Sequence, residues 1–121
     1  VGMSVPSHCT LLSGASQQLA EALAAVSVST PKITVMHNVD AAARSAPDAI
    51  RAALAAQLHQ PVQWTGTIST LAAQGVTHWL ECGPGKVLTG LVKRSVEGAV
   101  MAALEDPTIL AATAATLKEQ P

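Results

Sequence analysis

The sequence predicts an α/β fold in which short, mostly parallel strands alternate with flanking helices. Three observations support this prediction. Apolar residues recur at helical spacing in several segments, short β-branched runs lie between those segments, and proline or glycine separates most of them. The predicted order is helix, strand, helix, helix, strand, helix, strand, helix. Such alternation is typical of a mostly parallel sheet covered by helices.

The first half of the chain is predicted to form a helix, a strand, a loop and a second helix, at 11–26, 33–36, 37–40 and 47–59. Leu19 and Leu23 belong to the apolar stripe of the first helix. The strand is short and apolar, with β-branched residues beginning at Ile33. Pro47 and Asp48 suit the first turn of the second helix, where a missing amide and a negative charge are both favourable.

The second half is predicted to form an extended bridge, helix, strand, turn, helix, strand and final helix, at 61–64, 65–74, 76–81, 82–86, 87–96, 98–104 and from 107 onward. Pro61 ends the preceding helix, Thr65 is the predicted cap of the next one, and Gly75 is its predicted stop. The apolar residues of the helix at 87–96 are expected to face inward: Val87, Leu88, Leu91, Val92 and Val96.

The composition predicts a thin hydrophobic core. The chain has 121 residues, a length that suits one small domain, and 49% of them are hydrophobic, yet it contains no Phe, no Tyr and only two Trp. Alanine supplies much of the apolar content and buries little area per residue. Three short strands also leave sheet edges to be covered. We therefore expect the chain to pack against something else, and its start at Val1 fits a piece of a longer polypeptide.

Charge and cysteine content exclude several classes of function. The net charge is −1, and the Lys and Arg residues form no basic stripe of the kind that binds nucleic acid. Cys9 and Cys82 are far apart and have no partners at metal-ligand spacing, so we expect two free thiols, a reducing cytoplasmic location and no metal. No apolar run approaches the roughly 18 residues of a membrane span, so no membrane partner is expected.

A histidine near the start is the first candidate for chemistry. It lies in Ser4-Val5-Pro6-Ser7-His8-Cys9, where the stiff proline turn precedes a predicted helix, and it could act there as a general base. The alternative is an ordinary polar loop. No convincing nucleophile accompanies His8, because Gly2-Met3-Ser4-Val5-Pro6 lacks the second glycine of a nucleophile elbow and Cys82 has only Lys86 near it in sequence. The residues alone do not make a complete serine or cysteine enzyme.

The remaining candidates each have a structural alternative. Gly83-Pro84-Gly85-Lys86 opens a helix and could bind an anion, or could simply bring the helix close to the sheet; its spacing is not that of a phosphate-binding loop. Lys86 and Lys93, with Arg94, could guide an acidic partner to one helix face, or could be a solvated surface. For the other histidines a structural role is expected: His37, His59 and His78.

Three stretches in this order resemble the C-terminal part of bacterial malonyl-CoA–acyl carrier protein transacylases. They are Ser4-Val5-Pro6-Ser7-His8-Cys9, Gln57-Leu58-His59-Gln60-Pro61-Val62-Gln63-Trp64, and Glu81-Cys82-Gly83-Pro84-Gly85-Lys86-Val87-Leu88-Thr89-Gly90-Leu91. His37-Asn38-Val39-Asp40 is similar to the family's Asn-Asn-Val-Asp and departs from it at His37. The resemblance covers essentially the whole chain.

The resemblance implies a place in a larger enzyme. Residues 1–121 would form the C-terminal portion of its large, α/β-hydrolase-like subdomain, and the serine elbow, the carboxylate-binding arginine and the ferredoxin-like subdomain have no counterpart here. His8 matches the catalytic histidine. The backbone carbonyl of Gln57 matches the acceptor of that histidine's second N–H, the task that an aspartate performs in a protease triad. On this view the backbone position of Gln57 matters more than its side chain.

The implied reaction is malonyl transfer in fatty acid biosynthesis, an acyltransferase activity without a cofactor. His8 would deprotonate the serine for attack on malonyl-CoA, coenzyme A would leave, and the phosphopantetheine thiol of acyl carrier protein would collect the malonyl group. Lys86, Lys93 and Arg94 would dock the acidic carrier protein. The isolated chain would be inactive without the missing N-terminal portion. The alternative is a non-catalytic acyltransferase half that serves as a binding or packing module; an acyltransferase domain of a polyketide-type assembly fits the motifs less well.

Overall fold

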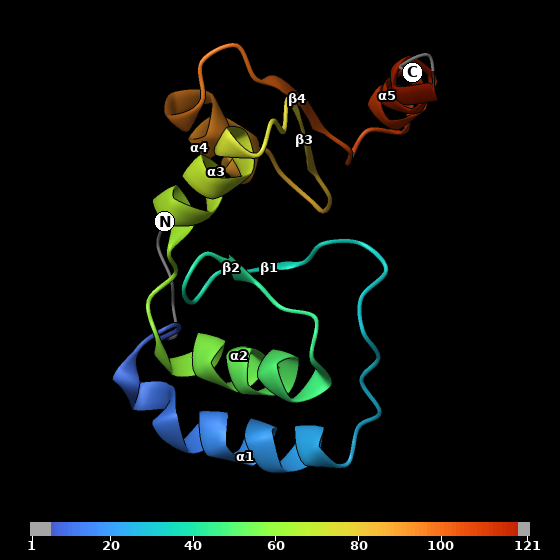
Figure 1. Ribbon diagram of the computed structural model, residues 1–121. Helices are drawn as coiled ribbons and strands as arrows, with labels where there is room; N and C mark the ends of the chain where they lie inside the picture. Colours follow the sequence, from blue (N-terminus) through green and yellow to red (C-terminus); the bar gives the residue numbers. More distant parts are fainter. Residues whose placement is uncertain (1–5, 119–121) are drawn as a thin grey trace. The chain divides into compact units, whose positions relative to one another are not determined.

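A computed structural model describes residues 6–118 and divides into two compact units, Val1–Thr67 and Ile68–Pro121 (Figure 1). The elements in chain order are the 3₁₀ helix η1 (Thr10–Leu12), α1 (Ser13–Ala24), β1 (Met36–His37), β2 (Ala42–Ala43), α2 (Pro47–His59), α3 (Trp64–Ala73), β3 (His78–Glu81), α4 (Val87–Ser95), β4 (Val100–Ala103) and α5 (Pro107–Lys118). The division between the units falls inside α3. The α/β class predicted from the sequence is confirmed.

In the first unit, α1 and α2 pack side by side (Figure 1). Arg51 of α2 donates from Nε to the carbonyl of Leu23 at 3.0 Å and from Nη2 to that of Val26 at 2.8 Å. Leu23 lies in the last turn of α1 and Val26 just beyond the helix, so Arg51 holds the chain where the helix ends. The buried Ser16 hydroxyl donates to the carbonyl of Ala55 at 2.7 Å, which ties the middle of α1 to α2. Polar contacts therefore supplement a small alanine-rich interface.

The predicted bounds of the first strand, residues 33–36, are wrong, because the strand observed is Met36–His37. The pairing is antiparallel and lies further along the chain, with Met36 opposite Ala43 and His37 opposite Ala42. Ile33 and Val35 are 80% and 47% exposed and have no partner strand in the described chain. Ala41 adopts a positive φ of 55°, which turns the chain back so that the two short strands meet. No residue preference signals β2, because its two alanines carry little strand preference.

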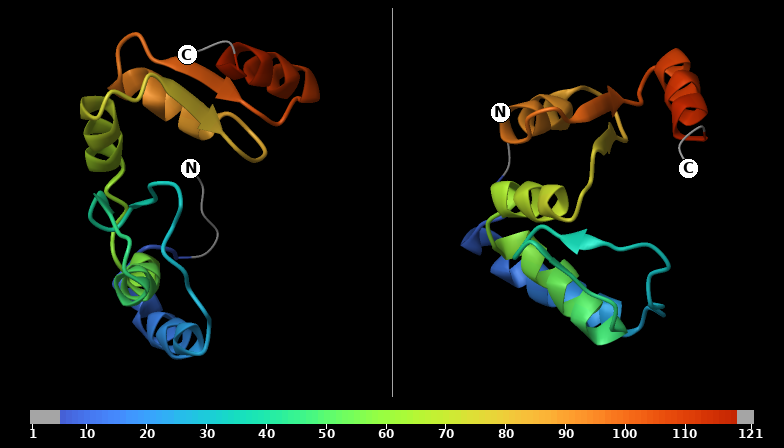
Figure 2. Two further views of the ribbon diagram at one scale, coloured as in Figure 1. Left: turned by 45° about the vertical axis from the view of Figure 1, so that its right-hand side comes forward. Right: turned by 45° about the horizontal axis from the view of Figure 1, so that its top comes forward.

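The second unit contains the predicted parallel pair. β3 and β4 lie side by side and are joined through α4 (Figure 2), with a register that runs from His78 opposite Val100 to Glu81 opposite Ala103. Both strands are shorter than predicted, and α5 follows β4. This strand–helix–strand arrangement is the part of the sequence pattern that the structure reproduces most fully.

The helix predicted to begin at a Thr65 cap begins one residue earlier, at Trp64. The carbonyl of Gln63 accepts the amide of Thr67 at 2.9 Å, and the amide of Gln63 donates to Asn38 at 2.6 Å. Gln63 thus makes the first backbone bond of the helix, and Thr65 lies inside the first turn. Gly75 follows the helix with φ of 87°, the left-handed conformation expected of a C-terminal glycine.

The N-terminus of α4 is satisfied by a carboxylate of its own chain. Glu81, at the end of β3, accepts the amides of Leu88 at 3.0 Å and Thr89 at 2.7 Å, and also the Thr89 hydroxyl at 2.7 Å. These bonds, with those from Thr89 foremost, lower the pKa of Glu81. An external anion is therefore not needed to pair the first amides of this helix.

The glycine turn before α4 is also bonded to a carboxylate of the chain. Gly83 and Gly85 have φ of 136° and 92°, values that a side chain would strain. The amide of Gly85 donates to the carboxylate of Glu105 at 2.7 Å. With both nearby carboxylates directed at backbone amides, the structure favours the packing interpretation of Gly83-Pro84-Gly85-Lys86 over an anion site.

The core is thin, as the composition predicts. No large side chain among residues 6–118 is fully buried. The expectation that all the apolar residues of α4 face inward is wrong for Val87 and Leu88, which are 58% and 44% exposed, whereas Val92 is buried. Much of the apolar area of these two side chains therefore stays uncovered at the start of the helix. Within residues 6–118, no helix combines the length and apolar character needed to cross a bilayer.

We predict that Glu81→Gln lowers the thermal unfolding midpoint of the chain at neutral pH, because a neutral amide accepts the α4 amides more weakly than a carboxylate. The folded-state pKa of Glu81 lies below its ordinary value of 4.5. The stabilisation is thus fully present above that value and is lost as the pH falls through the folded pKa. Melts of both forms should converge in acid. Glu97→Gln, at an exposed carboxylate, is the control; equal midpoints for Glu81→Gln and wild type at neutral pH would refute this role.

Candidate active site

His8 lies just before η1, and its ring is held by a carbonyl from the end of α2. The Nδ1 atom of the exposed ring is 2.6 Å from the carbonyl oxygen of Gln57. A carbonyl only accepts, so the proton of this bond resides on Nδ1 and the neutral ring keeps its lone pair on Nε2. His8 also has a positive φ of 53°, an unusual conformation for a residue with a side chain. The arrangement leaves a basic nitrogen available at the surface of this unit.

The Gln57 carbonyl is free to accept because of Pro61. In a continuing α-helix the amide of residue 61 would bond to the carbonyl of residue 57, but proline has no N–H. The last helical bond at this end runs instead from the amide of Gln60 to Ala56 at 3.1 Å, and Gln60 itself is extended. The C-terminal end of a helix carries partial negative charge, which favours a cation beside it. The end of α2 therefore places partial negative charge beside the His8 ring.

The side chain of Gln57 makes a second contact, which no feature of the sequence predicts. Its Nε2 is 3.0 Å from Nδ1 of His37, a residue of β1 that is only 3% exposed. Burial, and to a smaller degree the charge of Arg44, lowers the pKa of His37, against an opposing effect of Asp40. A neutral His37 can accept the amide proton of Gln57 at Nδ1. Gln57 thus joins two histidines, one through its backbone and one through its side chain.

An ion pair accompanies His37. Arg44 donates from Nη1 to Oδ1 of Asp40 at 3.0 Å, and its Nη2 contacts Oδ2 of the same carboxylate. The hydrogen bond from Arg44 lowers the pKa of Asp40, so the carboxylate stays charged at neutral pH. The pair fixes the turn that joins β1 to β2. Its members are bonded to each other and neither is hydrogen bonded to His37.

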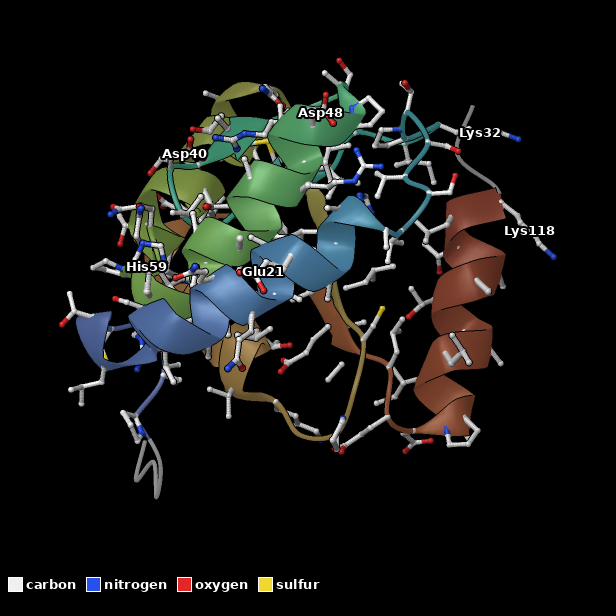
Figure 3. All side chains as sticks on the ribbon, turned by 90° about the horizontal axis from the view of Figure 1, so that it is seen from below. Glu21, Lys32, Asp40, Asp48, His59 and Lys118 are labelled. Carbon is white, nitrogen blue, oxygen red and sulfur yellow. The ribbon has the colours of Figure 1, made fainter. Side chains whose placement is uncertain are left out.

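A second serine–histidine contact is structural. His59, labelled in Figure 3 where the end of α2 passes α1, has Nδ1 3.0 Å from the Ser16 hydroxyl oxygen. Ser16 is 7% exposed and donates its own proton to Ala55. The histidine therefore donates to a hydroxyl oxygen whose own proton is already bonded to the Ala55 carbonyl. This is the reverse of the proton transfer that activates a nucleophile.

The basic residues predicted to bind a partner are exposed and belong to the second unit. The spacing of Lys86 and Lys93 predicts that both lie on one face of the helix. In the structure Lys86 occupies the N-cap position of α4, just before the helix, whereas Lys93 and Arg94 lie in its last turn. Hydrogen bonds from Thr108 and, to a smaller degree, the charge of Lys86 lower the pKa of Asp106. Lys86 therefore already has an acidic neighbour. Cys82 is exposed and Cys9 is half-buried, and both are free thiols.

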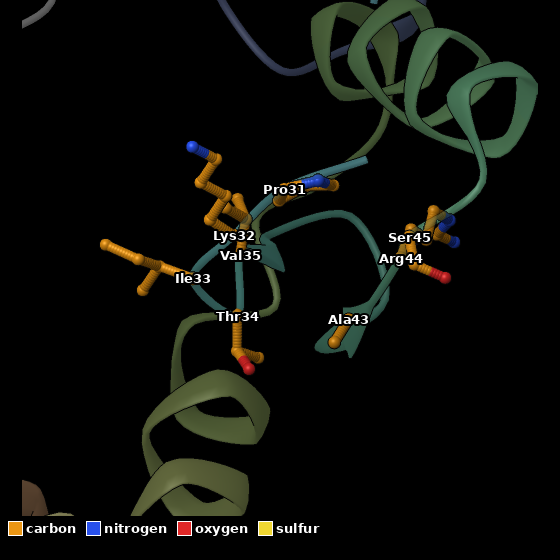
Figure 4. Close-up of a pocket in the computed structure, with 8 residues that line it drawn as sticks. All are labelled: Pro31, Lys32, Ile33, Thr34, Val35, Ala43, Arg44 and Ser45. Atoms are coloured by element: carbon orange, nitrogen blue, oxygen red, sulfur yellow. The ribbon is translucent and has the colours of Figure 1, made fainter. Parts of the chain in front are cut away.

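Two shallow hollows of the first unit contain neither His8 nor Gln57. One, of about 240 Å³, lies between 31–35 and 43–45 (Figure 4). The other, of about 380 Å³, lies beside α2 between Val39 and Gln60. Among residues 6–118, no group of three or more His, Cys, Asp and Glu side chains could hold a metal ion. Ser4 and Val5 of the predicted turn, and the rest of 2–5, lie outside the described residues.

Two curated proteins that resemble this chain share one name. No family model matches the chain. It is 49% identical over 110 residues to the malonyl CoA-acyl carrier protein transacylase of Escherichia coli K12, covering 91% of this chain and 36% of that relative. The malonyl CoA-acyl carrier protein transacylase of Bacillus subtilis is 36% identical over 118 residues, which cover 98% of this chain and 37% of that relative. The chain therefore spans little more than a third of the curated relatives it matches.

Solved structures show the same likeness. A malonyl-CoA:acyl carrier protein transacylase from Xanthomonas oryzae is 46% identical with a TM-score of 0.90, over 96% of this chain and 37% of that one. A malonyl-transacylase solved in complex with a type II polyketide acyl carrier protein is 41% identical with a TM-score of 0.91, over 96% and 38%.

We predict that Pro61→Ala weakens the bond between His8 and Gln57, because alanine restores an amide that competes for the same carbonyl. The measurement is the tautomer of the His8 ring from its two ¹⁵N chemical shifts. The Nδ1–H form should dominate in the wild type and decline in the variant. Pro47→Ala is the matched control, since it removes a proline from the first turn of the same helix, where no amide partner is required. An unchanged tautomer in Pro61→Ala would contradict the explanation.

Proposed function

We propose that this chain, which is homologous to part of the malonyl-CoA–acyl carrier protein transacylases, supplies the histidine base for malonyl transfer from malonyl-CoA to the phosphopantetheine thiol of acyl carrier protein. The observation that carries the proposal is the 2.6 Å contact between His8 Nδ1 and the Gln57 carbonyl. It produces the tautomer that a general base requires. The positive φ of His8 supports the same conclusion, because strained backbone concentrates at functional sites.

The chemistry proceeds in two half-reactions. In the first, His8 Nε2 takes the proton of a serine hydroxyl contributed by another part of the enzyme, and the serine oxygen bonds to the malonyl thioester carbon. The carbon–sulfur bond then breaks, and coenzyme A leaves with the proton returned from His8. In the second, His8 deprotonates the carrier thiol, and the thiol sulfur bonds to the malonyl carbon. The bond from that carbon to the serine oxygen then breaks, and His8 returns the proton to the serine. The Gln57 carbonyl stabilises the imidazolium that forms between these transfers.

The chain also has the surface expected of part of a larger subdomain. Its large exposed apolar side chains include Leu11, Ile33, Val87, Val100 and Leu110, each at least 48% exposed. Exposed apolar area on this scale marks surfaces that another polypeptide segment covers. Residues 1–121 would accordingly form the C-terminal portion of an α/β-hydrolase-like subdomain, with the serine elbow and the ferredoxin-like subdomain supplied from outside the chain.

The partner and the location follow from the same proposal. Lys93 and Arg94 present exposed positive charge at one end of α4, where an acidic carrier protein could dock, and Lys86 adds to it at the other end. The solved complex of a related malonyl-transacylase with a carrier protein supports this class of partner. Fatty acid synthesis of this type would place the chain in the cytoplasm. The chemistry above uses side chains and the thioester alone and calls for no cofactor.

We predict that the isolated chain transfers no malonyl group from malonyl-CoA to carrier protein, because the nucleophile lies elsewhere. The assay follows formation of malonyl carrier protein by mass spectrometry, with the intact enzyme that contains this segment as the positive control. Transfer by the isolated chain would show that its own residues include a nucleophile. A cooperative melt of the chain, together with a lack of activity in the intact form, would instead support the non-catalytic binding module.

In the intact enzyme, we predict that His8→Asn lowers kcat by about 10³-fold, the range expected for loss of a general base. Asparagine tolerates positive φ, so the fold should keep its melting temperature. His78→Asn, at a histidine of β3, is the control and should leave kcat unchanged. A loss of less than about tenfold for His8→Asn would assign the base to another group.

A further inference from the structure

We propose that His37 is a positioning residue for acyl transfer, because it holds the side chain of Gln57 and so orients the carbonyl that directs His8. The inference rests on the proposed function of His8. It adds a second histidine, from a different element, to the machinery of the same site.

The three residues form a continuous chain of contacts within the first unit. His37 Nδ1 lies 3.0 Å from Gln57 Nε2, and the Gln57 carbonyl oxygen lies 2.6 Å from His8 Nδ1. In this chain the Gln57 amide donates to His37, and His8 donates to Gln57. A displacement of the Gln57 side chain therefore acts on the residue whose carbonyl holds the base.

His37 is placed rigidly enough to act as an anchor. It is 3% exposed and is paired with Ala42 in the β1–β2 ladder, beside the Arg44–Asp40 ion pair. Burial keeps the ring neutral, as the lowered pKa indicates, and a neutral ring can accept at Nδ1. Its Nε2 is buried without a hydrogen-bond partner in the described chain, which costs free energy. The contact with Gln57 is thus the polar interaction that this buried ring makes.

Gln57 needs such an anchor because it lies in the last helical turn of α2. Helix ends fray, and Pro61 removes the backbone bond that would otherwise hold the Gln57 carbonyl. The bond to His8 requires that carbonyl to point in one direction. Fixing the far end of the Gln57 side chain on the buried ring of His37 limits rotation of the residue. The expectation that the backbone position of Gln57 matters more than its side chain would then need revision.

The test is a double-mutant cycle in the intact enzyme with His37→Leu, Gln57→Leu and both together. Each single variant should lower kcat by about 10- to 100-fold, the loss expected from misplacing a catalytic group, with an unchanged KM for malonyl-CoA. The double variant should be no worse than either single one, since both break the same contact. His37→Asn should retain most of the turnover because its Oδ1 can accept the Gln57 amide in place of Nδ1. His59→Leu is the matched control, a histidine of the same helix end that should affect the melting temperature but not kcat.

The outcomes separate this inference from the proposed function. If His8→Asn abolishes turnover while His37→Leu and Gln57→Leu leave kcat unchanged, the positioning role is overturned and the base assignment stands. If His8→Asn leaves turnover intact, the proposed function fails. Additive losses in the double variant, or no rescue by His37→Asn, would also overturn the inference. If His37→Leu does not fold, Gln57→Leu and His37→Asn decide the result.

Discussion

A single helix carbonyl, that of Gln57, sets the chemistry of His8. Because it accepts from Nδ1, it fixes the tautomer, leaves Nε2 basic and places the negative end of α2 beside the ring. Pro61 keeps this carbonyl available by withholding the amide that would continue the helix. On the proposed function, one backbone oxygen takes the place of the aspartate in a protease triad, and its position depends on where the helix stops.

The chain satisfies other helix ends with its own fixed side chains, and the contrast explains what is special at Gln57. Glu81 pairs the first amides of α4, and Arg51 pairs the last carbonyls of α1. Both partners carry full charge and come from regular elements. The end of α2 is instead paired by the exposed imidazole of His8. On the proposed function, this helix end serves proton transfer, whereas the other two serve stability.

The sequence predicts the β3–α4–β4 unit well because proline and glycine mark its boundaries and its strands are rich in strand formers. It misplaces the first strand and misses β2, because the pairing of His37 with Ala42 comes from a turn at Ala41 that no residue preference signals. His8 as a candidate base follows from its proline turn and from a family resemblance. The contact between Gln57 and His37 joins residues 20 positions apart and could be found only in the folded chain.

On the proposed function, the exposed apolar side chains are surfaces that the rest of a larger catalytic assembly covers. The most direct test is a crystal structure of the intact enzyme. The account predicts a serine hydroxyl within about 3 Å of His8 Nε2, with Nδ1 still on the Gln57 carbonyl. A His8 ring turned away from Gln57, or one with no nucleophile beside Nε2, would contradict it.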